Sequence, residues 1–178
     1  MNNPLATYLH DHLAGANFAV ELLQNLQQQH SDHETGAFAA TILAEVQEDR
    51  KVLERIIQNI GESHFDAKDA LAWLGEKVSR VKLSNGQPDD LSTFEALEML
   101  DLGIAGKVSL WRALRVIGQF DGRLAAFDFV ALLQRAQDQF NRVENYKLSI
   151  ARCAFGSESG QEEKAKQDLI DALDHSKR

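Results

Sequence analysis

Long stretches of the chain repeat apolar residues every three or four positions, and almost no proline interrupts them. Residues 5–29 show this first, with apolar side chains at Leu5, Leu9, Leu13, Ala16, Val20 and Leu23. Such spacing places the side chains on one face of an α-helix. The 178 residues include only 2 Pro and 11 Gly, which leaves little of the chain suited to a turn-rich β-sandwich. We therefore predict an all-α protein.

The helical pattern recurs along the chain and divides it into a bundle and a tail. We expect helices at about 4–29, 36–60, 66–82, 92–118 and 124–154. The expected N-cap residues are Ser31 or Asp32 for the second helix and Ser92 or Thr93 for the fourth. Residues 1–156 are expected to form one bundle domain, and residues 157–178 a flexible link with a C-terminal helical tail.

The order and length of these helices predict how the bundle is connected. Tight connections join the first helix to the second and the fourth to the fifth, so each pair forms an antiparallel hairpin. The stretch from about 61 to 91 holds only a short helix, yet it is long enough to run the length of a bundle. The sequence therefore predicts an up-down-down-up four-helix bundle with one long crossover.

Charge and composition argue against several classes of protein. The chain has 27 Asp+Glu against 19 Lys+Arg, and its basic residues form no run that would bind nucleic acid. No apolar stretch approaches the ~18–20 residues of a membrane span, and the start of the chain lacks the basic residues of a targeting segment. The single cysteine, Cys153, permits no internal disulfide. We expect a cytoplasmic protein that binds neither nucleic acid nor membrane.

This order of helices resembles that of the ferritin-like superfamily, over roughly residues 4–155. The segment Phe140–Lys147 adds to the resemblance, because its Val143-Glu144-Asn145-Tyr146 is similar to the Val-Glu-His-Tyr of bacterial stress-associated ferritin-like proteins. Asn145 stands where those proteins have His. Membership would imply a di-iron or di-manganese site, built from a Glu on each of two helices and a Glu-x-x-His on each of the other two.

The ligands that this resemblance implies are largely missing. In the second helix, Val46 stands in the place of the Glu and Asp49 in the place of the His. Glu95 and Glu98 of the fourth helix fall on the strip expected to face solvent. A redox metal pair needs several carboxylates and imidazoles aimed at one level of the core. We therefore expect no bound metal and no other cofactor, and we assign no catalytic residue.

Five polar residues are the candidates for the bundle interior: His12, Asp49, Gln137, Glu144 and Lys147. At 1.5 Å per residue, His12 and Asp49 lie about 12 Å and 16 Å from the same end of the first hairpin, so we expect them to approach each other, with Gln137 nearby. The alternative is that His12 only edges the core and Asp49 meets water or a backbone group. Lys147 lies too far along the bundle to reach Asp49, and we expect its ammonium to meet water or another carboxylate.

The fourth helix combines small residues with two apolar sides. Gly103 and Gly106 are three residues apart, where another helix could approach closely, either within the bundle or across a subunit interface. Leu110 and Trp111 lie on different sides of the helix, which must therefore be covered twice. Self-association as a homodimer is the expected partnership, because exposed apolar faces are usually covered.

Three classes of function follow from these patterns. The first is a helical bundle without a catalytic metal, acting as a structural or interaction protein. The second is an enzyme, a dimetal oxidase or peroxidase with an atypical ligand set drawn from Asp49, Glu45, Glu98, Glu144 and His12. The third is small-molecule binding between the helices, which has no sequence signal of its own and would be visible as a lined cavity. We expect the first.

Overall fold

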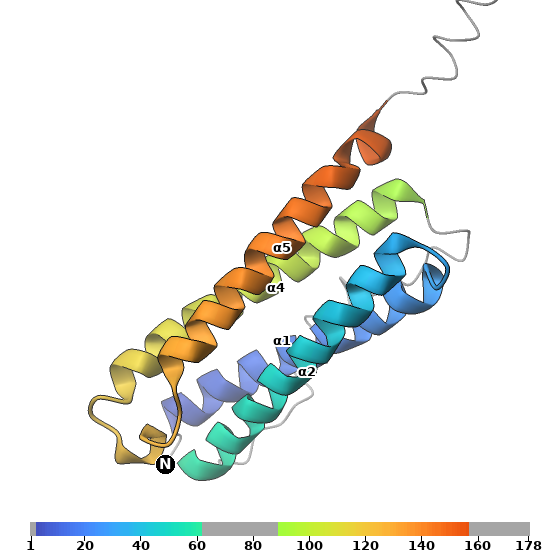
Figure 1. The fold of residues 1–178 in the computed structure, drawn as a ribbon. Coiled ribbons are helices and arrows are strands. Elements are labelled where there is room, and N and C mark those ends of the chain that lie inside the picture. The colour runs from blue at the N-terminus through green and yellow to red at the C-terminus, as the bar shows by residue number, and fades with distance from the viewer. Residues whose placement is uncertain (1–2, 62–88, 157–178) are drawn as a thin grey trace, which may run out of the picture.

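The computed structural model describes residues 3–61 and 89–156, and all the regular secondary structure in them is helical (Figure 1). Its elements are α1 (Pro4–Gln29), α2 (Glu34–Ile60), α4 (Asp90–Ile117), the short 3-10 helix η1 (Gly122–Leu124) and α5 (Phe129–Phe155). The all-α prediction is thus confirmed for these residues. The helix expected at 66–82 and the tail expected at 157–178 lie outside them. No described helix combines the length and the hydropathy needed to cross a membrane.

Two helices begin earlier than expected because other residues cap them. The side chain of Asp89 accepts a hydrogen bond from the backbone N–H of Ser92 at 2.6 Å, so α4 starts at Asp90 rather than near 92. At the start of α2, His33 occupies the N-cap position without a side-chain hydrogen bond. The expected caps were therefore wrong, and α2 begins at Glu34 instead of near 36. Pro4 does occupy the first turn of α1.

The largest boundary error concerns the fifth helix, which was expected to begin at 124. The chain instead forms η1 and a short loop before α5 starts at Phe129. The carboxylate of Asp128 accepts hydrogen bonds from the backbone N–H groups of Val130 and Ala131, both at 3.0 Å, and this cap fixes the start. Leu124 is 1% exposed although it precedes the helix. In the sequence, a buried apolar residue just before a helix cannot be told apart from one in the first turn of that helix.

The four long helices lie side by side as two hairpins, one of α1 and α2 and the other of α4 and α5 (Figure 1). At one end of the bundle, His30 Nε2 lies 3.0 Å from the Thr93 hydroxyl oxygen, which joins the end of α1 to the start of α4. At the other end, Asn59 donates to the backbone carbonyl of Arg123, joining the end of α2 to η1. Since α1 also packs against α4, these two helices are antiparallel neighbours.

The apolar core of the bundle is interrupted halfway along its length. One buried cluster includes Leu9, Leu53 and Trp111, and a separate one includes Val20 and Ile42. Between Leu9 and Val20, α1 has no buried residue. That gap is roughly 16 Å of helix. The residues at the interruption therefore determine the charge and the packing in the middle of the bundle.

The connection between α1 and α2 depends on the absence of a side chain at Gly36. A Cβ atom at this position would overlap the backbone carbonyl of His30 and lie 3.3 Å from the carbonyl oxygen of Gln27. We expect Gly36→Ala to lower the free energy of unfolding by about 1–3 kcal/mol, because backbone atoms must shift to relieve the overlap. Urea denaturation measures the change.

Gly15, in the middle of α1, provides the matched control. A Cβ atom there meets no atom within 4 Å in the part of the chain that the structure describes. Gly15→Ala should therefore stabilise the protein by about 0.5–1 kcal/mol, as expected for alanine in an open helical position. Equal effects of the two substitutions would show that α2 does not start this close to the end of α1.

Candidate functional site

Asp49 of α2 lies at the interruption of the core, between Val46 of one apolar cluster and Leu53 of the other. It is only 3% exposed, and cations from two other helices bind its carboxylate. Lys107 of α4 donates from Nζ to Oδ2 at 2.7 Å, and Arg135 of α5 donates to Oδ1. A carboxylate buried at this depth needs such partners to offset its lost hydration.

A glutamine completes this group of residues. Lys107 donates a second hydrogen bond to the side-chain oxygen of Gln139 on α5, a residue that is 0% exposed. We call Asp49, Lys107, Arg135 and Gln139 the central network. Burial lowers the pKa of Lys107, and the neighbouring Asp49 carboxylate opposes that shift without cancelling it.

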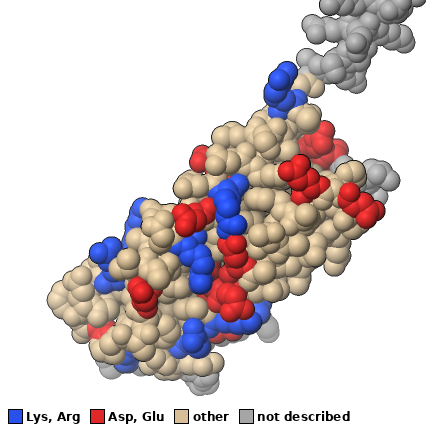
Figure 2. Space-filling model, in the orientation of Figure 1, with Lys and Arg blue, Asp and Glu red and all other residues tan. Residues whose placement is uncertain are grey.

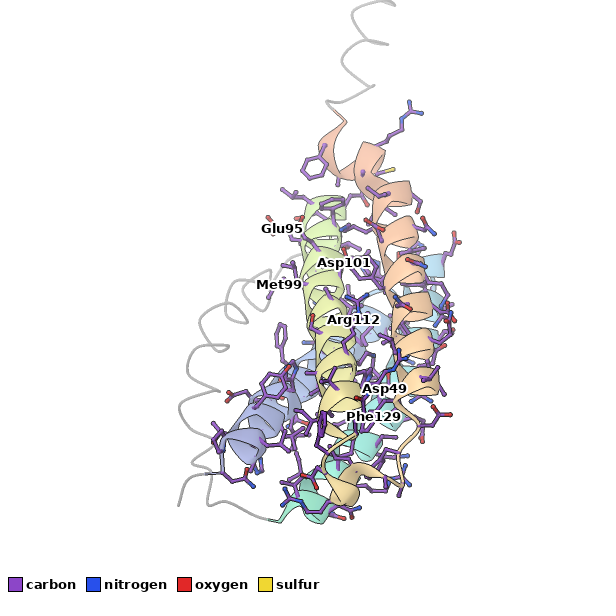
Figure 3. The ribbon with its side chains drawn as sticks, turned by 90° about the vertical axis from the view of Figure 1, so that its left-hand side faces the viewer. Asp49, Glu95, Met99, Asp101, Arg112 and Phe129 are labelled. Carbon is purple, nitrogen blue, oxygen red and sulfur yellow. The ribbon has the colours of Figure 1, made fainter. Side chains whose placement is uncertain are left out.

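Other charged pairs lie at different levels of the bundle. Lys147 of α5 donates to Asp101 of α4 at 2.7 Å, and both side chains are nearly buried. Figure 3 shows Asp101 and Asp49 well separated along the bundle. Arg142 of α5 pairs with Glu45 of α2 at the surface. Figure 2 shows acidic and basic side chains interspersed on one face of the bundle, and the pairs of Arg142 with Glu45 and Arg135 with Asp49 connect α2 to α5.

A cavity of about 490 Å³ lies beside the central network, between α1, α2 and α4. We call it the mid-bundle cavity. Its wall is mostly apolar, and Asp49 and Lys107 form part of it together with His12 and Trp111. Three glycines also line it: Gly15, Gly103 and Gly106. A Cβ atom at any of these three would meet no atom of residues 3–61 and 89–156 within 4 Å, so these residues leave space beside the glycines.

Hydrogen-bond donors outnumber acceptors around the cavity and the network. Both carboxylate oxygens of Asp49 are occupied. Four buried side-chain N–H groups of the cavity wall and the network have no hydrogen-bond acceptor among the described residues: Trp111 Nε1, Gln139 Nε2, Arg135 Nε and Arg50 Nε. Buried donors are ordinarily paired, and each unpaired one costs about 1–3 kcal/mol. The site is therefore deficient in oxygen acceptors.

The structure brings His12 and Asp49 to the same cavity, but it gives Asp49 other partners. The oxygens of Asp49 are held by Lys107 and Arg135. The imidazole of His12 packs edge-to-face on Tyr8, with ring centroids 4.6 Å apart, and burial lowers its pKa. His12 thus lies at the edge of the core, which was one of the two expected alternatives. The partners of Asp49 among the described residues are two side chains, Lys107 and Arg135, and not a backbone group.

Gln137, the glutamine expected near Asp49, is half-buried, whereas Gln139, which was not among the candidates, is fully buried and joins the central network. The buried positions of α5 are Phe129, Leu132, Ala136, Gln139 and Val143, a spacing of three, four, three and four. Phe140, the neighbour of Gln139, is only partly buried and packs against one of the apolar clusters. Glu144 and Lys147 are half-buried, and Asn145 is exposed.

Sequence reasoning missed Lys107, Arg135 and Asp101. A signal existed for two of them, because Lys107 follows Ile104 by three positions and Asp101 follows Leu97 by four. These spacings place both charged residues on the buried face of the helix. Arg135 had no comparable signal, since it is 41% exposed and reaches Asp49 only with the end of its side chain.

The residues present do not fit a dimetal centre. Within residues 3–61 and 89–156, no three His, Cys, Asp or Glu side chains come together in a way that could hold a metal ion. The proposed atypical set is dispersed: Glu45 pairs with Arg142, Glu98 is exposed, and Asp49 is held by two cations. A divalent ion beside Asp49 would face the positive charges of Lys107 and Arg135.

Gly103 and Gly106 do not receive a neighbouring helix within the described part of the bundle. Both instead line the mid-bundle cavity. Figure 3 shows Met99, another cavity residue, on the side of α4 away from α5. No family model, curated protein or solved structure matches the chain.

Proposed function

We propose that the protein is a metal-free helical bundle that binds a small, mostly apolar molecule in the mid-bundle cavity. This makes specific the interaction role expected from the sequence. We also infer a divergent ferritin-like ancestry. It is supported by the two hairpins, by the antiparallel contact of α1 with α4, and by charged residues at the level where the apolar core is interrupted.

The mid-bundle cavity is the observation that carries the proposal. Its volume of about 490 Å³ falls within the range of small-molecule sites, roughly 300–1,000 Å³. Such sites are mainly apolar and contain a few convergent polar groups that orient the ligand. Here Asp49 and Lys107 are those groups.

The unpaired donors define the polar end of the ligand. An oxygen atom of a carboxylate or carbonyl would accept from Trp111 Nε1, which has no acceptor among the described residues, and it would also suit Lys107. The preferred ligand is therefore an elongated apolar molecule with an oxygen-bearing head group.

A fluorescence titration with the uncharged apolar probe N-phenyl-1-naphthylamine tests this proposal. We expect saturable binding by the native protein and displacement of the probe by dodecanoate. Gly106→Leu should weaken probe binding about tenfold or more, because the leucine side chain occupies the space that the ligand needs. We expect the helix to tolerate this change, because none of the described residues places an atom within 4 Å of the new Cβ atom.

Ala44→Leu is the matched control, since Ala44 is exposed on α2 and does not line the cavity. It should bind the probe as the native protein does. Absence of saturable binding by the native protein, or unchanged binding by a folded Gly106→Leu variant, would contradict the proposal.

A homodimer is the competing proposal, and Leu102 favours it. This side chain lies on the cavity wall and is 69% exposed. If a second copy covers the cavity, light scattering will find a dimer, the probe will not bind, and Gly106→Leu will release monomers. That combination would replace the small-molecule proposal.

A further inference from the structure

We propose that Lys107 is the attachment site for apolar aldehydes that enter the mid-bundle cavity, and that its Nζ forms an imine with the aldehyde carbon. This inference rests on the proposed function, and it names apolar aldehydes as the class of ligand that would bind covalently in the cavity. It concerns the same buried amine of Lys107, which acts as a nucleophile in its neutral form.

The hydrogen bonds of Lys107 suit a neutral amine. Its Nζ contacts two acceptors among the described residues, Asp49 Oδ2 and Gln139 Oε1. A neutral amine has two N–H groups and one lone pair, so it can keep both hydrogen bonds and still hold the lone pair free. An ammonium group would have a third N–H with no acceptor among these contacts. The geometry thus suits a nucleophile.

Some of the charges around Lys107 raise its pKa and others lower it. Asp49 and Glu45 of α2 favour the ammonium form, whereas Arg135 of α5 disfavours it. Asp11 and His12 of α1 line the same cavity. Burial is the largest influence and lowers the pKa of Lys107, which raises the fraction of free amine near neutral pH.

Loss of the proton from Lys107 does not leave the buried carboxylate unpaired. Arg135 still holds Oδ1 of Asp49 after Lys107 becomes neutral. A protonated imine at Lys107 restores a positive charge next to Oδ2. Asp49 is therefore paired before and after the reaction, which avoids the cost of an isolated buried charge.

The reaction is a condensation without oxidation or reduction. The lone pair of Nζ attacks the carbonyl carbon, the C=O π electrons move to oxygen, and transfer of the ammonium proton to that oxygen gives a carbinolamine. The hydroxyl group then leaves as water after taking up a proton, and a C=N bond forms between the aldehyde carbon and Nζ. One aldehyde is consumed and one water is released for each imine.

Lys147 provides a natural comparison within the same bundle. It pairs with Asp101 at 2.7 Å, the same distance as Lys107 to Asp49, and its side chain is 12% exposed against 15% for Lys107. Only Lys107 of the two lines the mid-bundle cavity. The two lysines therefore share a carboxylate partner and a low exposure, and they differ in access to the cavity and in the Arg135 and Gln139 side chains beside Lys107.

The test is incubation of the full chain with decanal near neutral pH, with sodium cyanoborohydride to reduce the imine to a stable secondary amine. Intact mass and peptide mapping then locate the adduct. We expect one adduct per chain at Lys107, formed at least about tenfold faster than at Lys147. Dodecanoate should slow it by competing for the cavity.

Variants separate the outcomes. Lys107→Arg keeps the cation but has no reactive amine, so the rapid adduct should be lost, while Lys147→Arg should retain it. Adducts spread evenly over Lys147 and the exposed Lys51 would overturn the inference. Probe binding without an adduct at Lys107 would refute only the covalent step, whereas loss of both probe binding and adduct would also refute the proposed function.

Discussion

Replacing Asp49 with alanine should lower the free energy of unfolding by about 3–5 kcal/mol, the effect expected when one partner of a buried ion pair is removed. The substitution leaves Lys107 without its carboxylate in a site where its side chain is only 15% exposed. It also removes the partner of Arg135, although that side chain can turn toward water. Urea denaturation monitored by circular dichroism measures the change.

The surface pair of Glu45 and Arg142 is the matched control, because it also connects α2 to α5. Both side chains are substantially exposed, so Glu45→Ala should cost less than about 1 kcal/mol. Asp49→Leu combined with Lys107→Met should recover most of the loss, since apolar replacement of a buried pair is often neutral or stabilising. A small effect of Asp49→Ala alone would show that the central network is hydrated rather than buried.

Trp111→Ala should lower the free energy of unfolding by a similar amount, about 3–5 kcal/mol. It removes a large buried side chain, and the surrounding helices cannot move enough to fill the space that is left. Trp111 is 1% exposed and belongs to the apolar cluster on the Pro4 side of the interruption. It also forms part of the cavity wall. Thermal and urea unfolding both report the loss.

Trp111→Phe distinguishes volume from hydrogen bonding at the same position. Phenylalanine keeps most of the apolar contact and removes an indole N–H that has no acceptor among the described residues. We expect a cost below about 1.5 kcal/mol. A loss as large as that of the alanine variant would mean that the N–H group has a partner and that the acceptor deficiency is not real.

The contact between α2 and α5 differs from the contact between α1 and α4 in a way that bears on function. Ion pairs join α2 to α5, through Arg135 with Asp49 and Arg142 with Glu45. The seam between α1 and α4 contains the cavity and its three glycines. A ligand that enters between α1 and α4 would therefore meet an apolar wall first and the central network at its inner side.

Much of the fold could be predicted from local sequence. The spacing of apolar residues identified the four described helices, and Pro4 marked the first turn of α1. The same pattern placed Asp49 on an inward face, because it lies between Val46 and Leu53 at helical spacing. Glu95 and Glu98 were expected on the solvent side and are exposed.

The partners of those residues could not be predicted in the same way. Lys107 and Arg135 approach Asp49 from 58 and 86 positions along the chain. The buried face of α5 includes Gln139 and not Phe140, a difference of one position along the helix. An error of this size was enough to make Gln137 the candidate instead of Gln139. The spacing of apolar residues is compatible with either position, whereas a buried hydrogen bond can form from only one of them.

The sequence by itself determined that the chain is helical, where most helices run and that Asp49 faces inward, because these properties follow from the spacing of neighbouring residues. The tertiary structure decided that a carboxylate in the middle of the bundle is paired with a lysine and an arginine, and that a cavity remains beside them. Both depend on how four helices pack against one another, since the charge that neutralises Asp49 and the space next to it come from separate helices.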